Sequence, residues 1–251
     1  MEELKSHAPE LQTRRGQGWL ILRFAGIVAI VSLFYVWVDR VFAEWMPDGE
    51  ILITAIGFLI LSLFFRRKKL YQQRYGPLAY QNAARDYALP GLAILIACIA
   101  HISYMPGPLI PDVVWWKPIL FWAGVLLVFL GAALWVRSAQ TIGVDNLSLL
   151  YVYFPEESKL VNLSIYSILR HPIYGSALYI SIGLAFMSGN WFALVVVLLL
   201  PVLWTGWIRL VEEKELINRF PGYVEYRKQV PAFFPKIRDL YRLSRFLVLG
   251  S

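Results

Sequence analysis

Two short polar clusters could do chemistry in this otherwise apolar chain. The first is Arg170-His171-Pro172-Ile173-Tyr174, directly before an apolar stretch, and the second follows that stretch and the next one, with Arg209, Glu212 and Glu213. A proline has a preset φ and no backbone N–H, so it suits the first turn of a helix. The free N–H groups and positive dipole end there attract a carboxylate or phosphate, and the neighbouring arginine would strengthen the attraction.

The second cluster adds carboxylates. Arg209 and Glu213 are four residues apart, which predicts that they share one helical face, with Glu212 on an adjacent face. Carboxylates accept hydrogen bonds from ribose hydroxyls in dinucleotide sites, so this pair could hold a ligand with diol and ammonium groups. The purely structural alternatives are a salt-bridged helix end here and a snorkelling arginine in the first cluster. The residues alone leave both interpretations open.

The composition indicates a membrane protein. Of 251 residues, 58% are hydrophobic and 16% are charged, and the mean hydropathy is +0.55, above the ordinary range of globular domains. The net charge of +7 belongs to the connections between apolar runs, which favours an anionic lipid surface over nucleic acid as the partner. Cys98 is the only cysteine, so no intrachain disulfide is possible.

The expected fold is an all-α, polytopic transmembrane bundle of about six spans with a cytoplasmic C-terminal helical segment. A span needs roughly twenty apolar residues. Residues 71–89, broken at Gly76-Pro77, are expected to form a helix at the interface, and residues 137–169 to be polar and irregular. Two regions are expected, residues 1–117 and a core of residues 118–251. The predicted spans are residues 19–38, 51–65, 90–104, 118–136, 173–187 and 191–207.

Basic residues flank the spans on one side and acidic residues on the other. By the positive-inside rule both termini should face the cytoplasm, and the two polar clusters then share the cytoplasmic face. The basic side carries Arg14, Arg15, the run Arg66 to Lys69, Arg209, Lys214 and Arg219, and the acidic side carries Asp39, Glu44, Asp48 and Glu50.

The order and spacing of several short elements resemble the isoprenylcysteine carboxyl methyltransferase and phospholipid methyltransferase superfamily. The resemblance covers roughly residues 121–235, about the last half of the chain. The elements are Lys159-Leu160-Val161, Ile165-Tyr166, Arg170 to Tyr174, Glu212-Glu213 with Leu216, and Phe220, Gly222, Tyr223, Tyr226 and Val230-Pro231.

This resemblance implies an integral membrane enzyme that uses S-adenosylmethionine. Ser158 to Val161 would contact the cofactor partly through backbone, Tyr166 would pack near its nucleoside, and either glutamate would complete the pocket. Arg209 would face the substrate as the catalytic residue. The implied cofactor-binding residues are Ser158, Lys159, Leu160, Val161, Tyr166, Arg170, His171, Pro172, Ile173, Tyr174, Glu212 and Glu213.

Two departures from the family pattern stand out. The family's small glycine comes one residue early, at Gly175, but Ser176 is still small enough to preserve close helix packing. Where prenylcysteine enzymes carry a histidine, this chain has Ser158-Lys159, which weakens the case for that substrate in particular.

The expected reaction is in-line methyl transfer to a carboxylate, thiol or amine of a lipophilic or small acceptor presented from the bilayer. Alignment of the reacting groups can supply up to roughly 7–11 kcal/mol. A carboxylate or thiolate needs little help from a base near neutral pH, whereas an ammonium must first lose a proton. Asp145, Glu156 and Glu157 are candidate bases by location only, and no metal site is predicted.

Two other classes remain open at this stage. NADPH-dependent, steroid-reductase-like membrane oxidoreductases also carry an RHPNY motif, but they follow it with Gly-Glu, where this chain has Ser176-Ala177, and they lack the glutamate pair. A non-enzymatic scaffold or transporter is the third reading. His101, inside the third predicted span, is its best evidence, because ionisable groups within a membrane usually have a function.

Overall fold

The chain folds into a bundle of long apolar helices, as predicted. The computed structural model describes residues 2–42, 45–111, 115–157 and 160–250, and this part of the chain contains no β-strand. Five helical stretches are long and apolar enough to cross a membrane, and a sixth, Pro172–Ser188, is shorter. The bundle helices are α2 (Arg14–Val41), α3 (Met46–Arg66), α6 (Leu89–His101), α7 (Lys117–Ile142), α9 (Pro172–Ser188) and α10 (Trp191–Trp207).

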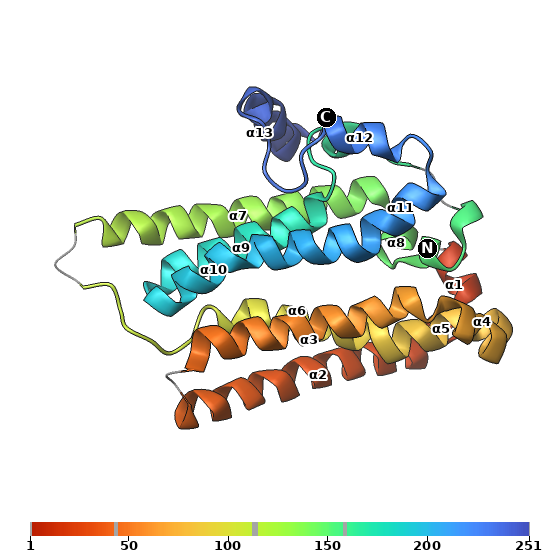
Figure 1. Cartoon of the computed structure of the whole chain (residues 1–251), viewed down its shortest axis with the longest axis horizontal. Coiled ribbons are helices and arrows are strands. Elements are labelled where there is room, and N and C mark those ends of the chain that lie inside the picture. The colour runs from red at the N-terminus through yellow and green to blue at the C-terminus, as the bar shows by residue number, and fades with distance from the viewer. Residues whose placement is uncertain (1, 43–44, 112–114, 158–159, 251) are drawn as a thin grey trace.

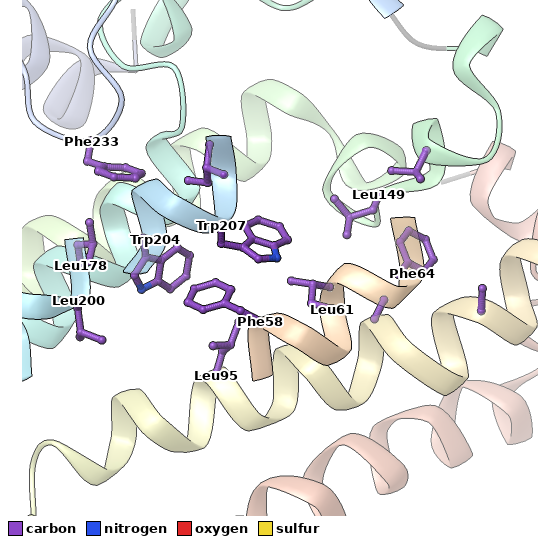
Figure 2. Close-up of a cluster of buried hydrophobic side chains, with 14 of the residues drawn as sticks. Phe58, Leu61, Phe64, Leu95, Leu149, Leu178, Leu200, Trp204, Trp207 and Phe233 are labelled. Carbon is purple, nitrogen blue, oxygen red and sulfur yellow. The ribbon is translucent and has the colours of Figure 1, made fainter. Parts of the chain in front are cut away.

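The helices form two layers. In Figure 1, α2, α3 and α6 lie together on one side and α7, α9 and α10 on the other. Helix α10 packs on α3, and α9 packs on α6, which joins the layers. Between them lies an aromatic cluster (Figure 2), in which the Phe58 ring is 5.1 Å from the Trp204 ring and 5.4 Å from the Trp207 ring. Such ring pairs add to the apolar area that they bury.

Helices α7 and α9 approach each other closely because small residues face each other. A Cβ atom on Gly183 would lie 2.6 Å from the carbonyl oxygen of Gly124, and one on Gly131 would lie 2.9 Å from that of Ser176. Small residues let membrane helices gain dispersion contacts backbone against backbone. Ser176 is buried in this contact, so the prediction that it preserves close helix packing is confirmed.

The predicted interfacial segment is helical and continues into α6. It comprises α4 (Lys68–Tyr75), η3 (Gly76–Leu78), α5 (Ala79–Ala83) and the π-helical turn η4 (Ala84–Ala88). Gly76, at φ +52°, makes the predicted break. The aromatic side chains Tyr71 and Tyr80 of this segment do not lie at a surface, however, because both are buried in the main core.

Other boundaries shift by several residues. The third span ends at His101 rather than at residue 104, and α7 continues to Ile142, so the irregular segment begins later than predicted. The last span does not stop at Trp207, because the chain stays helical through η8 to Arg219. The short elements are α1 (Glu2–His7), η1 (Pro9–Gln12), α8 (Val144–Leu147), η5 (Leu150–Val152), η6 (Pro155–Glu157), η7 (Ser164–Ser167), η8 (Ile208–Glu212), α11 (Glu213–Arg219), α12 (Tyr223–Gln229), η9 (Ile237–Asp239) and α13 (Leu240–Leu249).

A triad of ionisable side chains, Asp39, Glu50 and His101, joins α2, α3 and α6. His101 Nδ1 lies 2.7 Å from Glu50 Oε2, and His101 Nε2 lies 3.2 Å from Asp39 Oδ1. The side chains of Glu50 and His101 are fully buried, and the Tyr35 ring stacks on the imidazole at 3.8 Å. His101 therefore has two carboxylate partners, one from each of the neighbouring helices.

Candidate active site

A cavity of about 330 Å³ lies between the two layers, at the end where α11 begins. This volume is within the range of small-molecule sites. One part of its wall is apolar and comes from the bundle helices, and the other part is polar. The apolar wall includes Phe24, Leu61, Leu92, Ile96 and Trp135, and the polar wall includes Tyr151, Tyr166, His171, Glu212, Arg219 and Tyr223.

Most of the predicted cofactor-binding residues line this cavity. Ser158 and Lys159 lie outside the described residues. Glu213 is fully buried beside the cavity rather than in its wall, and Arg209 is outside it. The predicted residues in the wall are Leu160, Val161, Tyr166, Arg170, His171, Pro172, Ile173, Tyr174 and Glu212.

Glu213 is the centre of an ion-pair network that joins the two clusters predicted to face each other. Its Oε1 atom lies 3.0 Å from Arg170 Nη2 and 3.2 Å from His171 Nε2. The Tyr223 hydroxyl donates to the same oxygen at 3.3 Å, and Arg227 Nη1 pairs with Oε2 at 3.3 Å. These donors offset the cost of burying the carboxylate. Glu213 therefore stabilises the wall of the cavity and does not need a ligand as a partner.

The first cluster is also fixed through its backbone. The N–H groups of Arg170 and His171 donate to the carbonyl oxygens of Pro231 and Ala232, at 2.9 Å and 3.1 Å. Pro172 then begins α9, as predicted. A Cβ atom on Gly175 would lie 3.1 Å from the carbonyl oxygen of Phe233, so glycine at this position lets the C-terminal segment approach α9.

Glu212 is the buried carboxylate that does face the cavity. The residue is 6% exposed, and its Oε1 atom accepts one long hydrogen bond, at 3.4 Å, from the Tyr151 hydroxyl. Its Oε2 atom and the Tyr166 hydroxyl are buried and have no hydrogen-bond partner among the described residues. A buried carboxylate oxygen without a donor is costly, so this wall is complementary to a ligand that brings one.

The expectation that Arg209 and Glu213 share one helical face is wrong. Arg209 is exposed, whereas Glu213 is fully buried. The chain between them, η8, is a π-helical turn that places both glutamates toward the protein interior. Such turns are rare and often occur at functional sites. The structure therefore does not bring Arg209 to the cavity, and its predicted catalytic role stays untested.

Sequence reasoning missed Arg219 and Tyr151 as part of the site. The guanidinium of Arg219 lies 4.1 Å from the Tyr151 ring centroid and 4.5 Å from that of Phe220, and it pairs with Glu215 at 3.0 Å. The buried arginine is thus held at the cavity wall between two aromatic rings. Nothing in the spacing of Tyr151 distinguished it from the surrounding irregular segment.

Tyr223 and Tyr226 carried part of the family resemblance but were not predicted as site residues. Both line the cavity, and the Tyr226 hydroxyl donates to the carbonyl oxygen of Tyr166. Burial raises the pKa of both phenols, and it also raises the pKa of Tyr151 and Tyr166. All four therefore stay neutral near pH 7, where they can donate hydrogen bonds but cannot serve as phenolate bases.

Of the three candidate bases, Asp145 and Glu156 are not among the described residues that line the cavity wall. Asp145 Oδ1 accepts a hydrogen bond from the backbone N–H of Leu4 at 3.2 Å, which ties α1 to α8. Glu156 is exposed, and the side chain of Glu157 lies outside what the structure describes. Among the described residues that line the cavity, Glu212 is the one carboxylate.

Comparison with known proteins identifies the same family as the sequence motifs. Residues 119–221 match the family described as Phospholipid methyltransferase, which begins close to where the resemblance was placed. The chain is 30% identical to Protein-S-isoprenylcysteine O-methyltransferase B of Arabidopsis thaliana, over 61% of this chain and 75% of that protein. It is 27% identical to Protein-S-isoprenylcysteine O-methyltransferase A of the same plant, over 60% of this chain and 74% of that protein.

A further relative is named for metal resistance and not for methyl transfer. The chain is 31% identical to the cobalt-zinc-cadmium resistance protein CzcN of Cupriavidus metallidurans, over 52% of this chain and 56% of that protein. No solved structure matches the chain. The methyltransferase relatives decide between the three classes that the sequence left open. The protein is a membrane methyltransferase and belongs to the family of isoprenylcysteine and phospholipid methyltransferases.

Proposed function

We propose that the protein transfers a methyl group from S-adenosylmethionine to a lipophilic acceptor, with the cofactor in the polar part of the cavity. The observation that carries this proposal is the Oε2 atom of Glu212, which is buried in the wall and has no donor among the residues that the structure describes. Within the same part of the chain, the Tyr166 hydroxyl in the wall has no hydrogen-bond partner either. A ligand with a ribose diol and an ammonium group supplies donors for a carboxylate and a hydrogen-bond partner for a phenol.

The residues around these atoms position the ligand. S-adenosylmethionine supplies a methyl group on a positively charged sulfonium. Glu212 provides the negative charge that such a cation needs in a water-poor site, and Tyr151 orients the carboxylate through its hydrogen bond. The Glu213 network holds His171 and Tyr223 in the wall, so the site is largely formed before binding.

The cavity favours an acceptor that is already deprotonated. The described wall carries one carboxylate, that of Glu212, which faces the cofactor, and its tyrosines are neutral. A carboxylate or a thiolate needs no base, whereas an ammonium would first have to lose a proton.

The apolar part of the cavity is suited to the acceptor's hydrocarbon part. Phe24, Leu92 and Ile96 line it, and Leu92 and Ile96 are 37% and 47% exposed on the bundle surface. Their exposed faces would lie in the hydrocarbon of a bilayer, so a lipid tail can reach the cavity without crossing water. The basic flanks of the spans support a cytoplasmic position for this end of the bundle and for both termini.

The test is methyl transfer by detergent-purified protein. It is incubated with S-adenosylmethionine labelled in the methyl group and with fractions of a membrane lipid extract, and the extractable products are counted. Label in a lipid fraction is expected, together with calorimetric binding of S-adenosylmethionine and of its demethylated product. Binding of NADPH without binding of either of these would refute the proposal.

Glu212→Gln tests the observation on which the proposal depends. The amide keeps the shape but removes the charge, so we expect the affinity for S-adenosylmethionine to fall by at least about tenfold, equivalent to roughly 1.4 kcal/mol. Thermal unfolding of the free protein should change little or rise, because an uncompensated buried charge is removed. The matched control is Glu225→Gln, since Glu225 is exposed and forms a surface ion pair with Lys228. Equal affinity for S-adenosylmethionine in the two variants would show that Glu212 does not contact the cofactor.

A further inference from the structure

The C-terminal basic segment, residues 236–249, combines exposed cations with exposed apolar side chains. Its inner face is apolar, since Leu243 and Phe246 are buried against the cluster of Leu134, Ile165 and Leu169. Its outer face carries Ile237, Tyr241 and Val248, which are 89%, 75% and 74% exposed. The segment holds a single acid, Asp239, and four exposed cations, which are Lys236, Arg238, Arg242 and Arg245.

The charges in this segment are not balanced within the protein. Asp239 pairs with both Arg238, at 3.8 Å, and Arg242, at 3.3 Å, so one carboxylate serves two cations. Lys236 Nζ donates to a backbone carbonyl, and no ion pair of Arg245 is formed within the described part of the chain. A helix that is apolar on one side and basic along its exposed edge matches the chemistry of an anionic bilayer surface.

The position of α13 along the bundle agrees with this partner. Helix α7 begins at Lys117, and the twenty residues from there to Arg137 rise by about 30 Å, the thickness of the hydrocarbon layer. Arg137 thus marks the edge of the hydrocarbon. Its Nη2 atom donates to the carbonyl oxygen of Val248 at 3.3 Å, which places the end of α13 at the level of the lipid headgroups.

The same helix supports one wall of the cavity. Arg242 Nη2 donates to the Ser167 hydroxyl at 3.0 Å, and Leu243 and Phe246 pack on Ile165. Tyr166, between these contacts in η7, lines the cavity. Whatever holds α13 in place therefore also holds Tyr166.

We propose that the C-terminal basic segment binds the anionic headgroups of the bilayer surface and thereby stabilises η7 and the Tyr166 wall of the cavity. The cations Arg238 and Arg245 meet lipid phosphates, and Tyr241 and Val248 enter the adjacent apolar boundary. The protein is then most ordered around Tyr166 in a membrane that contains anionic lipid.

The experiment reports lipid contact without using methyl transfer, so its outcome is independent of the proposed function. Val248→Cys is introduced into full-length protein carrying Cys98→Ser, labelled with an environment-sensitive fluorophore, and placed in nanodiscs of phosphatidylcholine alone or with 30% phosphatidylglycerol, a fraction chosen as about that of an anionic membrane. We expect blue-shifted emission in the anionic discs, reversed by high salt because salt screens headgroup charge. Hydrogen exchange of residues 164–169 should be slower in the same discs.

Two double variants test whether the effect of anionic lipid depends on Arg238 and Arg245 or on any pair of exposed cations. Arg238→Gln with Arg245→Gln should abolish both effects of anionic lipid, and Arg242 is left in place because it also binds Ser167. Lys69→Gln with Arg74→Gln, which removes two exposed cations from α4, should leave both effects intact. Identical emission in the two kinds of disc, or a shift that survives both salt and the Arg238/Arg245 variant, would overturn the proposal.

Discussion

Adjacent residues can have opposite roles at the same site, as Glu212 and Glu213 do. Both are buried, but Glu213 has donors on both carboxylate oxygens, whereas one oxygen of Glu212 has none among the described residues. The free energy of a buried carboxylate depends mainly on its partners, so the first is part of the scaffold and the second is complementary to a ligand. Substitutions at the two positions should therefore affect different measurements.

Glu213→Gln should destabilise the protein strongly. The variant leaves Arg170 and Arg227 without their carboxylate, and breaking a buried ion pair on one side typically costs about 3–5 kcal/mol. Since Arg227 is partly exposed, the lower end of that range is expected. Thermal unfolding in detergent measures the change. A variant as stable as the wild type would show that the donors around Glu213 are satisfied by other groups.

At the scale of elements, the site depends on how closely helices pack and where they end. Helix α9 begins at the wall of the cavity and is held against α7 by glycines along their contact. The C-terminal segment after α12 is held against α9 by backbone hydrogen bonds to the first cluster. The position of His171 in the wall is thus set by contacts on both sides of α9.

Gly183→Ala should disrupt the contact between α7 and α9. The new Cβ atom would lie 2.6 Å from the Gly124 carbonyl oxygen, so the helices must separate, at a cost of roughly 1–3 kcal/mol. The control is Gly206→Ala in α10, where no heavy atom lies within 4 Å of the added Cβ. That variant should be neutral or stabilised by up to roughly 1 kcal/mol, because alanine loses less backbone entropy in a helix. Equal unfolding temperatures for the two variants would contradict the close packing.

The sequence predicted the elements well and their precise ends less well. Pro172 and Gly76 act locally, through fixed or permitted backbone angles, so the start of α9 and the break before α5 could be read directly. The π-helical turn η8 could not, because it depends on tertiary contacts of Glu212 and Glu213. Assuming regular helical spacing placed Arg209 on their face, whereas the structure leaves it exposed.

The sequence predicted those site residues that are adjacent in the chain or belong to the family pattern. The residues of the first cluster are consecutive, and the family pattern supplied Tyr166 and the glutamates. Tyr151 and Arg219 come together across 68 residues through a cation–π contact and a hydrogen bond, and no local spacing encodes such a contact. The division of the chain at residue 117 stays a prediction.

At the scale of the whole molecule, two layers enclose the cavity, and the matched family region lies within one of them and the segments that follow it. The matched family region begins with α7, whereas α2, α3 and α6 precede it and supply much of the apolar wall. The N-terminal layer is held together near one end by Asp39, Glu50 and His101. Loss of that triad should therefore loosen the layer that is proposed to contact the acceptor.

His101→Leu should destabilise the protein more than replacement of all three triad residues. The single variant leaves the buried Glu50 and the partly buried Asp39 without their imidazole partner, at an expected cost of about 3–5 kcal/mol. The triple variant Asp39→Leu, Glu50→Met, His101→Leu removes the charges altogether and should recover most of that loss. Thermal unfolding in detergent compares the three proteins. If the triple variant is less stable to heat than the single variant, the interactions within the triad stabilise the fold by more than the cost of burying its members.

The triad also imposes an order on the biogenesis of the protein. Asp39 and Glu50 are synthesised first, and His101 follows Glu50 by 51 residues. At a synthesis rate of roughly 5–20 residues per second, the two acids wait roughly 3–12 s for their partner. Until α6 arrives, each acid is costly to place in hydrocarbon. We therefore expect α2 and α3 to remain near water or the translocation machinery during this interval, and the first three helices to enter the lipid as one unit.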